Sequence, residues 1–401
     1  MLPECRQEEY LFSVPKFDVA SSDVESFVDE LRCFHDEYRD CFHRSETREN
    51  VFHYMVGQFS KLERKSIEPI ARAVEDAKVR TMQRAVSGTN WDEEKLLAKY
   101  RSMVNDDMGD PDGVLLFDES GFVKKGKESA GVLRQYCGSV GKVENCQVGV
   151  FAAYASAHGY AFLDKRLFVP EEWFSEEYKE RREKCDFPKD FTFKTKPQMA
   201  SEMLTEIHRQ EIIPYKYIVA DSIYGHSPDF IEAAEKLDGK IYLVSIASDT
   251  QCWLKVPVTM VKEYKYKGEI HTKSVLEDTA KKPISVQEIA ANLNDYFWYR
   301  RKVSEGTKGP IEYEFCKRRV TLSRDGLPWK TVWLVIRRTI EENSTYTFFI
   351  SNAPGNTRLS TLVWLCGIRW AIEQCFEEGK TELGMDHYEV RKYAGWDHHM
   401  L

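Results

Sequence analysis

Residues 113–120 read GVLLFDES, and this stretch decides the fold class. Its run of large apolar residues, closed by acids, predicts a short buried strand that ends at Asp118. Residues 215–222, YKYIVADS, repeat the pattern and predict a second buried strand that ends at Asp221. An α/β sheet places its functional groups at the carboxyl ends of its strands. We therefore expect an α/β fold in which these two aspartates mark a site.

The segments that follow these strands alternate between the two patterns of regular structure. Alternating or continuous apolar residues predict strands, and apolar residues at helical spacing predict helices. The expected order is strand 147–156, strand 159–169, helix 197–210, strand 215–222, helix 228–237 and strand 240–248, then strand 345–354 and one long helix at 359–383. This order is typical of a mixed sheet flanked by helices.

Residues 250–345 interrupt the alternation. They are rich in Val, Tyr, Trp, Thr and Lys, and they predict a β-rich insertion with one helix near 285–294. The segment 291–340 holds eleven Lys and Arg against five Asp and Glu, although the whole chain has a net charge of −8. Within it, YFWYRRK at 296–302 fits a surface that stacks bases and binds phosphates, and it fits an ordinary strand with one buried face equally well.

Residues 1–110 predict an all-helical N-terminal domain. Helices at 67–77 and 79–88, joined by a tight turn, resemble a helix-turn-helix reader of DNA. We expect Asn90 and Glu93 to form a capping box for the next helix. The second helix of the pair carries or adjoins the basic residues Lys78, Arg80 and Arg84. A helical bundle with a solvated basic face explains this pattern as well as DNA binding does.

Composition excludes several classes of protein. The chain of 401 residues is 42% hydrophobic, which excludes global disorder. It contains no run of eighteen apolar residues, so no membrane span is predicted. The first ten residues are acidic where a signal peptide is basic, so we expect a cytoplasmic protein. Ten cysteines without a CxxC pair indicate reduced, mostly buried thiols. The pattern CFHDEYRDCFH at 33–43 is read as a packed helix, with a zinc site as the alternative.

The segment RWAIEQCFEEGK at 369–380 adds a third acid. On one helix Arg369, Glu373 and Lys380 share a face, and such a set suits a metal ligand between two phosphate-binding cations. The alternative is a surface helix with ordinary ion pairs, and Glu377 competes with Glu373 as the ligand. Carboxylates that converge from different elements can hold two Mg²⁺ ions for phosphoryl transfer.

The segment 121–142 between two expected strands combines cations with glycines. Its backbone can approach a phosphate closely, and its cations can neutralise one. A flexible, solvated hairpin is the alternative, but beside the metal acids DNA contact is favoured. The cations chosen as DNA-contacting residues are Lys124, Lys125, Lys127 and Arg134. His226, just beyond ADSIYG, is a further residue that could approach the site, although a structural role is the simpler interpretation.

Four stretches carry a resemblance to a known family: LERKSIEPIA (62–71), the block from Asp118 to Ser156, ADSIYG (220–225), and 369–400. The chain resembles the DDE transposases of bacterial insertion sequences, in the group with a Tyr-Arg-Glu-Lys signature. Within that group it is most similar to insertion-sequence family seven-zero-one. The match covers most of the chain, and the second block is its most specific part.

The resemblance implies an RNase H-like catalytic core, at 111–249 and 346–401, with the 250–345 insertion inside it and the DNA-binding helices at 1–110. Its catalytic and metal-binding acids fall on Asp118, Asp221 and Glu373. The signature Arg and Lys fall on Arg369 and Lys380, and the signature Tyr is replaced by Cys366.

The resemblance also implies cofactors and partners. Two Mg²⁺ or Mn²⁺ ions are expected at the site. The expected partners are double-stranded DNA, both the terminal inverted repeats of the element and its target, and a second copy of the chain in a homodimer on that DNA. A bacterial, nucleoid-associated location in the cytoplasm follows from this activity.

Two other functions compete with this interpretation. Paired carboxylates also serve glycoside hydrolysis, which needs no metal and gives the basic loops no purpose. Family members usually continue beyond WDHHML with another apolar helix. The chain could therefore be a truncated, catalytically inactive DNA-binding remnant that acts as a repressor.

Overall fold

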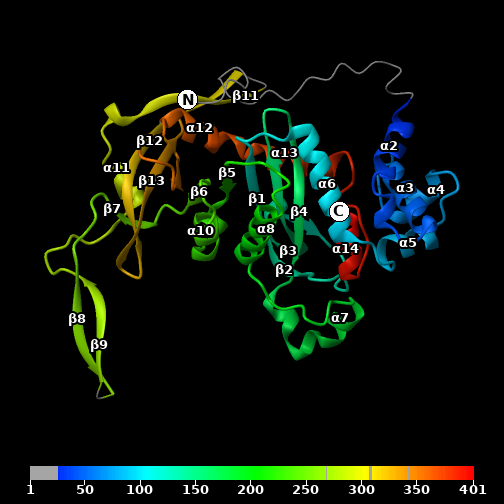
Figure 1. Ribbon diagram of the computed structural model, residues 1–401, viewed down its shortest axis with the longest axis horizontal. Helices are drawn as coiled ribbons and strands as arrows, with labels where there is room; N and C mark the ends of the chain where they lie inside the picture. Colours follow the sequence, from blue (N-terminus) through cyan, green and yellow to red (C-terminus); the bar gives the residue numbers. More distant parts are fainter. Residues whose placement is uncertain (1–25, 268, 307–308, 342) are drawn as a thin grey trace. The chain divides into compact units, whose positions relative to one another are not determined.

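The computed structural model describes residues 26–267, 269–306, 309–341 and 343–401, and Figure 1 shows their helices and strands. Two compact units divide the chain. Among the described residues, unit 1 comprises Lys216–Arg369, and unit 2 comprises 26–215 together with Trp370–Leu401. These limits differ from the expected domain boundaries, which remain a prediction.

Unit 2 begins with helices, as the sequence predicts. They are α2 (Phe27–Asp36), the short η2 (Arg39–Cys41), α3 (Ser45–Gln58), α4 (Ile67–Ala73), α5 (Val79–Ser87) and α6 (Glu93–Met108). The expected helix pair is present as α4 and α5, and Gly88 caps α5. The expected capping box at Asn90 is wrong, because the N-cap of α6 is Asp92, whose side chain accepts a hydrogen bond from the Lys95 amide. That aspartate directly precedes the first helical residue, so its carboxylate reaches the third amide of the first turn.

An antiparallel sheet follows in unit 2. Its strands are β1 (Val114–Val123), β2 (Leu133–Cys137), β3 (Lys142–Ala155) and β4 (Tyr160–Phe168). β3 is central, with β1 on one side and β2 and β4 on the other. β1 does not end at Asp118, because β3 is long enough to pair with it as far as Val123. The expected loop 121–142 therefore contains the end of β1 and all of β2, which pairs with the beginning of β3, and residues 124–132 are its loop part.

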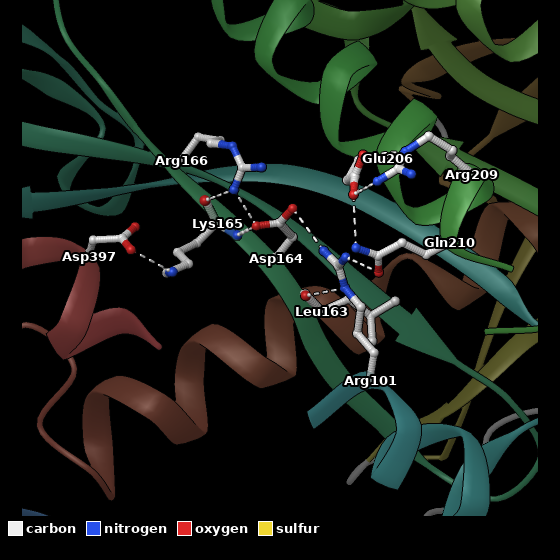
Figure 2. A network of polar contacts seen from close by, with 9 residues as sticks. All are labelled: Arg101, Leu163, Asp164, Lys165, Arg166, Glu206, Arg209, Gln210 and Asp397. Carbon is white, nitrogen blue, oxygen red and sulfur yellow. Dashed lines mark hydrogen bonds and ion pairs between the residues drawn. The ribbon is translucent and has the colours of Figure 1, made fainter. Parts of the chain in front are cut away.

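Helices cover this sheet and bury both of its faces around β3. The covering helices are α6, α8 (Lys196–Gln210), α13 (Trp370–Thr381) and α14 (Tyr393–Met400). Between β4 and α8 the chain forms three short helices, η4 (Glu171–Phe174), η5 (Glu176–Tyr178) and α7 (Lys179–Lys184). Figure 2 shows how a polar network joins several of the covering helices. Arg101 of α6 binds Asp164 of β4 at 2.9 Å, and both side chains are almost fully buried. Lys165, on the other face of β4, binds Asp397 of α14 at 3.0 Å.

Unit 1 is built on a mixed sheet. Its elements are β5 (Tyr217–Ala220), α9 (Ser222–Gly225), α10 (Pro228–Glu235), β6 (Ile241–Ile246), β7 (Gln251–Trp253), β8 (Thr259–Tyr266), β9 (Glu269–Leu276), β10 (Ile284–Ser285), α11 (Val286–Ala291), η6 (Asp295–Phe297), β11 (Tyr299–Gly306), β12 (Gly309–Arg324), β13 (Leu327–Arg338), β14 (Tyr346–Ser351) and α12 (Leu359–Ile368). The strand order is β10-β7-β12-β13-β14-β6-β5, and β11 pairs with β12. Strands β5 and β6 are parallel, and the other pairs are antiparallel.

Strands and helices are thus mixed as expected, and the α/β fold class is confirmed. The β-rich character of 250–345 is also confirmed, with α11 as its one α-helix in the described part of that segment. The single long helix expected at 359–383 is wrong, because α12 ends at Ile368 and α13 begins at Trp370. The chain passes from unit 1 to unit 2 at this break. Within the described ranges, no helix is both long enough and apolar enough to cross a membrane.

Candidate active site

Asp118 lies on β1 opposite Phe151 of β3. Directly opposed residues of antiparallel strands point to the same face, and alternate residues of one strand do so too. Asp118, Ser120 and Phe122 therefore share one face of β1. The carboxylate of Asp118 is half-buried and accepts a hydrogen bond of 2.9 Å from the Glu119 amide. Glu119 points to the opposite face, where its carboxylate lies 3.1 Å from the ammonium of Lys196.

Helix α13 covers the face of β1 that carries Asp118. The Lys380 ammonium donates to the Ser120 hydroxyl at 2.8 Å and to the Gly121 carbonyl at 3.3 Å. Phe376 of the same helix packs against Phe151, the cross-strand neighbour of Asp118, with ring centroids 5.1 Å apart. These contacts fix both the position and the rotation of α13 on the sheet.

Glu373 precedes Lys380 by seven residues on α13, so the two side chains leave nearly the same side of the helix, about 10 Å apart along its axis. Lys380 is bound to Ser120, and Trp370 at the other end of α13 packs against Tyr160. The helix therefore runs back along β1 from Ser120, with Glu373 between these two contacts. The Glu373 side chain is exposed, as a ligand for an incoming ion requires. Glu377 is also exposed, so exposure alone does not separate the two candidates.

Asp221 belongs to unit 1, where it directly follows β5 and caps α9. Its Oδ1 accepts a hydrogen bond of 2.6 Å from the Ser222 amide. The guanidinium of Arg369 lies 3.9 Å from its Oδ2, so the predicted signature arginine approaches a predicted catalytic acid. His226, by contrast, binds the Ser222 carbonyl through Nδ1 and the Ala247 amide through Nε2. Both of its ring nitrogens hold the backbone, which indicates a structural role.

Close packing requires glycine at the last position of the turn ADSIYG, Gly225. A Cβ atom on Gly225 would lie 1.9 Å from the carbonyl oxygen of Ser245 on β6. Only glycine lets α9 approach β6 this closely. The glycine therefore sets the position of the turn that begins at Asp221.

The carboxylates fit hard divalent cations by their chemistry. Mg²⁺ takes oxygen ligands and uses few of them from the protein, and the carboxylates of Asp118, Asp221 and Glu373 are of this ligand type. Asp118 and Glu373 are in unit 2 and Asp221 is in unit 1. Over the described ranges, no three or more His, Cys, Asp or Glu side chains form a group that could hold a metal ion.

Comparison with known proteins identifies the family. The family model for the DDE superfamily endonuclease matches residues 37–310, more than half of the chain. The chain belongs to the DDE superfamily of endonucleases. Its resemblance to insertion-sequence transposases and its expected enzyme class, transposase and endonuclease, are thereby confirmed.

Two individual proteins are similar to this DDE chain. The "probable transposase for insertion sequence element IS701" of Microchaete diplosiphon is 25% identical over 369 residues, which cover 92% of the chain and 82% of that protein. A piggyBac transposase synaptic complex with hairpin DNA matches with a TM-score of 0.37 and 10% identity, over 98% of this chain and 66% of that one. The chain thus spans just under two thirds of the piggyBac structure. The family match favours an endonuclease over the glycoside hydrolase, and it does not favour the inactive remnant.

The predicted phosphate-binding cations of this DDE chain fall into two groups. Lys125, Lys127 and Arg134 are exposed. Lys124 instead donates to the Tyr388 carbonyl at 2.9 Å and lies over the ring of the same tyrosine. Burial lowers the pKa of Lys124 to about 7, and it also lowers the pKa of Lys380. Both of these ammonium groups have protein partners, and their contact with DNA phosphate remains a prediction.

Cys366 and His35 are both packing residues. Cys366 stands where the family signature has Tyr, and burial in α12 raises the pKa of its thiol to about 12. It is therefore a packing residue. His35, from the pattern considered for zinc, stacks on Phe42 and is buried with neither ring nitrogen hydrogen-bonded. Its environment is that of a packed helix, as predicted.

The sequence interpretation missed Ser120 and Gly121, which receive Lys380. Their position in the sequence, two and three residues after Asp118 and before the apolar pair Phe122 and Val123, could have predicted that they belong to the same strand. It was overlooked because the strand was expected to end at the aspartate.

Proposed function

We propose that this DDE chain is a transposase that binds the terminal inverted repeats of an insertion sequence, cleaves the DNA strands at the ends and joins them to a target. The observation that carries the proposal is the arrangement in unit 2, where α13 brings Glu373 over the face of β1 that holds Asp118. In the DDE family context, these are the positions of two acids of the predicted triad.

Asp118, Asp221 and Glu373 would hold two Mg²⁺ or Mn²⁺ ions. When bound, such ions activate water or a 3′-hydroxyl and neutralise the charge that develops on the phosphate. The protein's own part is to position the carboxylates and the DNA. Phe151, Phe162 and Phe376 pack against one another on the face of the sheet that carries Asp118.

The cations orient the DNA backbone. Arg369, beside Asp221, presents a planar guanidinium that can bind a phosphate through two nitrogens. Lys125, Lys127 and Arg134 contribute exposed charge on the segment after β1. Lys380 holds α13 on β1, and Lys124 holds the same segment against Tyr388. Helices α4 and α5, with Arg80 and Arg84, are the proposed reader of the inverted repeats.

The same proposal covers the finer architecture. The core at 111–249 and 346–401 is RNase H-like, 250–345 is inserted in it, and 1–110 is the DNA-binding part. Joining two ends requires two active sites, so the chain acts as a homodimer on DNA. Its place of action is the bacterial cytoplasm, on the nucleoid.

Matched acid variants test the assignment. Purified protein is incubated with Mg²⁺ and a duplex that carries an element end, and strand cleavage is measured on a sequencing gel. Asp118→Asn and Glu373→Gln should lower the cleavage rate by roughly 10³-fold, since each removes a charge that stabilises the transition state by several kcal/mol. The neighbours Glu119 and Glu377 offer the controls, and Glu119→Gln and Glu377→Gln should keep most of the activity. Full cleavage by Asp118→Asn, or a greater loss in Glu377→Gln than in Glu373→Gln, would contradict the triad.

A further inference from the structure

Strands β8 and β9 form a two-stranded ribbon of their own in unit 1. Figure 1 shows this ribbon as an arm that stands off the larger sheet. Every residue of β8 except Met260 is exposed, so core packing does not explain the choice of its side chains. An isolated hairpin is only marginally stable in water, and the ribbon gains little from burial in its own chain.

The strand register sorts the side chains onto two faces. On one face Lys262 opposes Lys273, and Tyr264 opposes His271, with Tyr266 next along the strand. We call these five residues the basic face. The opposite face pairs Lys265 with Ile270 and Glu263 with Thr272, and it includes Val261. The three rings of the ribbon therefore lie on one face together with the directly opposed lysine pair. Met260, Val275 and Glu269 share that face, and Lys265 lies on the other.

The pair of Lys262 and Lys273 destabilises the ribbon when no anion is bound. Like charges that face each other directly across two strands destabilise the pair. Lys262 has an exposed carboxylate, Asp278, at 3.3 Å, and exposed pairs of this kind contribute little. Lys273 lies 5.3 Å from the ring centre of Tyr264. An anion placed across the two ammonium groups would turn their repulsion into an attraction.

The aromatic part of the basic face continues from the lysines toward the turn. The rings of Tyr264 and His271 are 5.7 Å apart, and those of His271 and Tyr266 are 6.1 Å apart. Lys267, at the turn, lies 5.5 Å from the Tyr266 ring. Flat rings flanked by ammonium groups suit the sugar and base edges of a nucleic acid beside its phosphates.

Size and charge favour double-stranded DNA as the occupant. Strands of this length span about 26 Å, and the major groove, about 12 Å wide, admits a two-stranded β-ribbon. Residues 259–276 contain four lysines and two glutamates, although the whole chain is acidic, with a net charge of −8. The ribbon therefore has the sign that DNA phosphates require.

We propose that the β8–β9 ribbon is a DNA-binding arm that places its basic face in the major groove of a duplex. This inference rests on the proposed function, since it assumes that the chain acts on DNA. It adds a contact that is separate from the catalytic acids and from helices α4 and α5. Lys262 and Lys273 bind phosphates on this arm, and the rings of the basic face, which are next along the strands, contact the groove.

Two single variants on opposite faces of the ribbon test the proposal. Lys273→Gln and Lys265→Gln remove the same charge from the same hairpin, but only the first changes the basic face. The full chain is titrated into a fluorescein-labelled duplex of mixed sequence at several salt concentrations, and anisotropy gives the affinity. Lys273→Gln should weaken binding roughly threefold and reduce the slope of log K against log salt by about 0.9. Lys265→Gln should leave that slope unchanged.

The double variant Lys262→Gln/Lys273→Gln extends the test. Its salt slope should fall by about 1.8, and its thermal unfolding should not move to lower temperature, because the variant relieves a like-charge pair. Equal losses in Lys273→Gln and Lys265→Gln would overturn the inference, since bulk charge would then explain them. No loss in either would also overturn it, as would a change of oligomeric state in place of DNA affinity.

The outcomes separate this inference from the proposed function. A wild-type chain that neither binds nor cuts DNA contradicts the proposed function itself. A wild-type chain that binds and cuts, with variants that match it in affinity and salt slope, contradicts only the arm.

Discussion

The ammonium of Lys380 donates a hydrogen bond of 2.8 Å to the hydroxyl of Ser120, and this contact ties helix α13 to strand β1. The same ammonium donates to the Gly121 carbonyl. The two bonds hold the helix that carries Glu373 against the strand that carries Asp118. The interaction therefore affects both stability and the placement of a predicted metal ligand.

Removing the contact of Lys380 with Ser120 should lower the stability of the fold and disturb the placement of Glu373. Lys380→Met leaves two acceptors without their donor, and we expect a loss of about 1–3 kcal/mol in the free energy of unfolding, measured by urea denaturation. Ser120→Ala should cost less, because the lysine keeps Gly121. In the double variant the losses should be non-additive, since the residues are in direct contact. Strict additivity would show that the bond does not form.

Gly225 offers a test of the turn that begins at Asp221. Gly225→Ala places a methyl group 1.9 Å from the Ser245 carbonyl, so α9 must move away from β6. We expect a loss of roughly 1–3 kcal/mol in stability, as for other overpacked sites, and a fall in the cleavage rate. Gly355→Ala is the control, because nothing lies within 4 Å of a Cβ atom there. Equal behaviour of the two variants would contradict the close approach of α9 and β6.

The buried pair of Arg101 and Asp164 should respond asymmetrically to substitution. Asp164 has two cationic partners, Arg101 and Arg166, so Arg101→Met leaves the carboxylate with one of them. Asp164→Asn leaves the Arg101 guanidinium buried without an anion. We expect Asp164→Asn to lower the free energy of unfolding by about 3–5 kcal/mol and Arg101→Met to lower it by less. Denaturation curves that ranked the variants in the reverse order would contradict this account.

His399 should make the fold sensitive to acid. The Tyr54 hydroxyl binds its Nδ1 at 2.8 Å and the Met385 carbonyl binds its Nε2 at 3.0 Å, a pattern that the neutral ring satisfies. Burial lowers the pKa of His399 to about 4, from an ordinary value of 6.5. The unfolded chain then binds the proton more readily than the folded chain does, so stability is fully present above pH 6.5 and is lost as pH falls through 4.

A variant isolates this contribution. His399→Gln keeps a donor for Met385 but has no titrating ring, so its stability should change less between pH 6.5 and 4 than that of the wild type. Burial also lowers the pKa of His35 to about 4, and that residue remains as an internal source of acid sensitivity. Identical pH profiles for wild type and variant would exclude His399 as a contributor.

Local patterns predicted the elements well where one pattern dominated. The strand before Asp221 ends at Ala220, within one residue of the expected end, because Asp221 caps the helix that follows. The run before Asp118 continues to Val123, since β3 supplies a pairing partner that the local pattern does not reveal. Strand length at this position depends on a segment more than twenty residues away.

The same limit applies to helices and cations. The apolar and charged periodicity of 359–383 is continuous, yet the backbone breaks between Ile368 and Trp370, where the chain changes unit. Lys124 and Lys125 are adjacent and chemically identical, but only Lys124 reaches Tyr388 and becomes partly buried. Residue type predicted a cation at both places, and tertiary contacts alone distinguish the one available to a ligand.

The thiols provide an independent way to follow each unit. All nine described cysteines are free, and only Cys33 is exposed. Cys252, Cys316 and Cys366 are buried in unit 1, and the remaining buried thiols are in unit 2. Among these nine, a thiol-reactive dye should therefore modify Cys33 first in the folded chain. The order in which the other eight become labelled during denaturation would show which unit opens earlier.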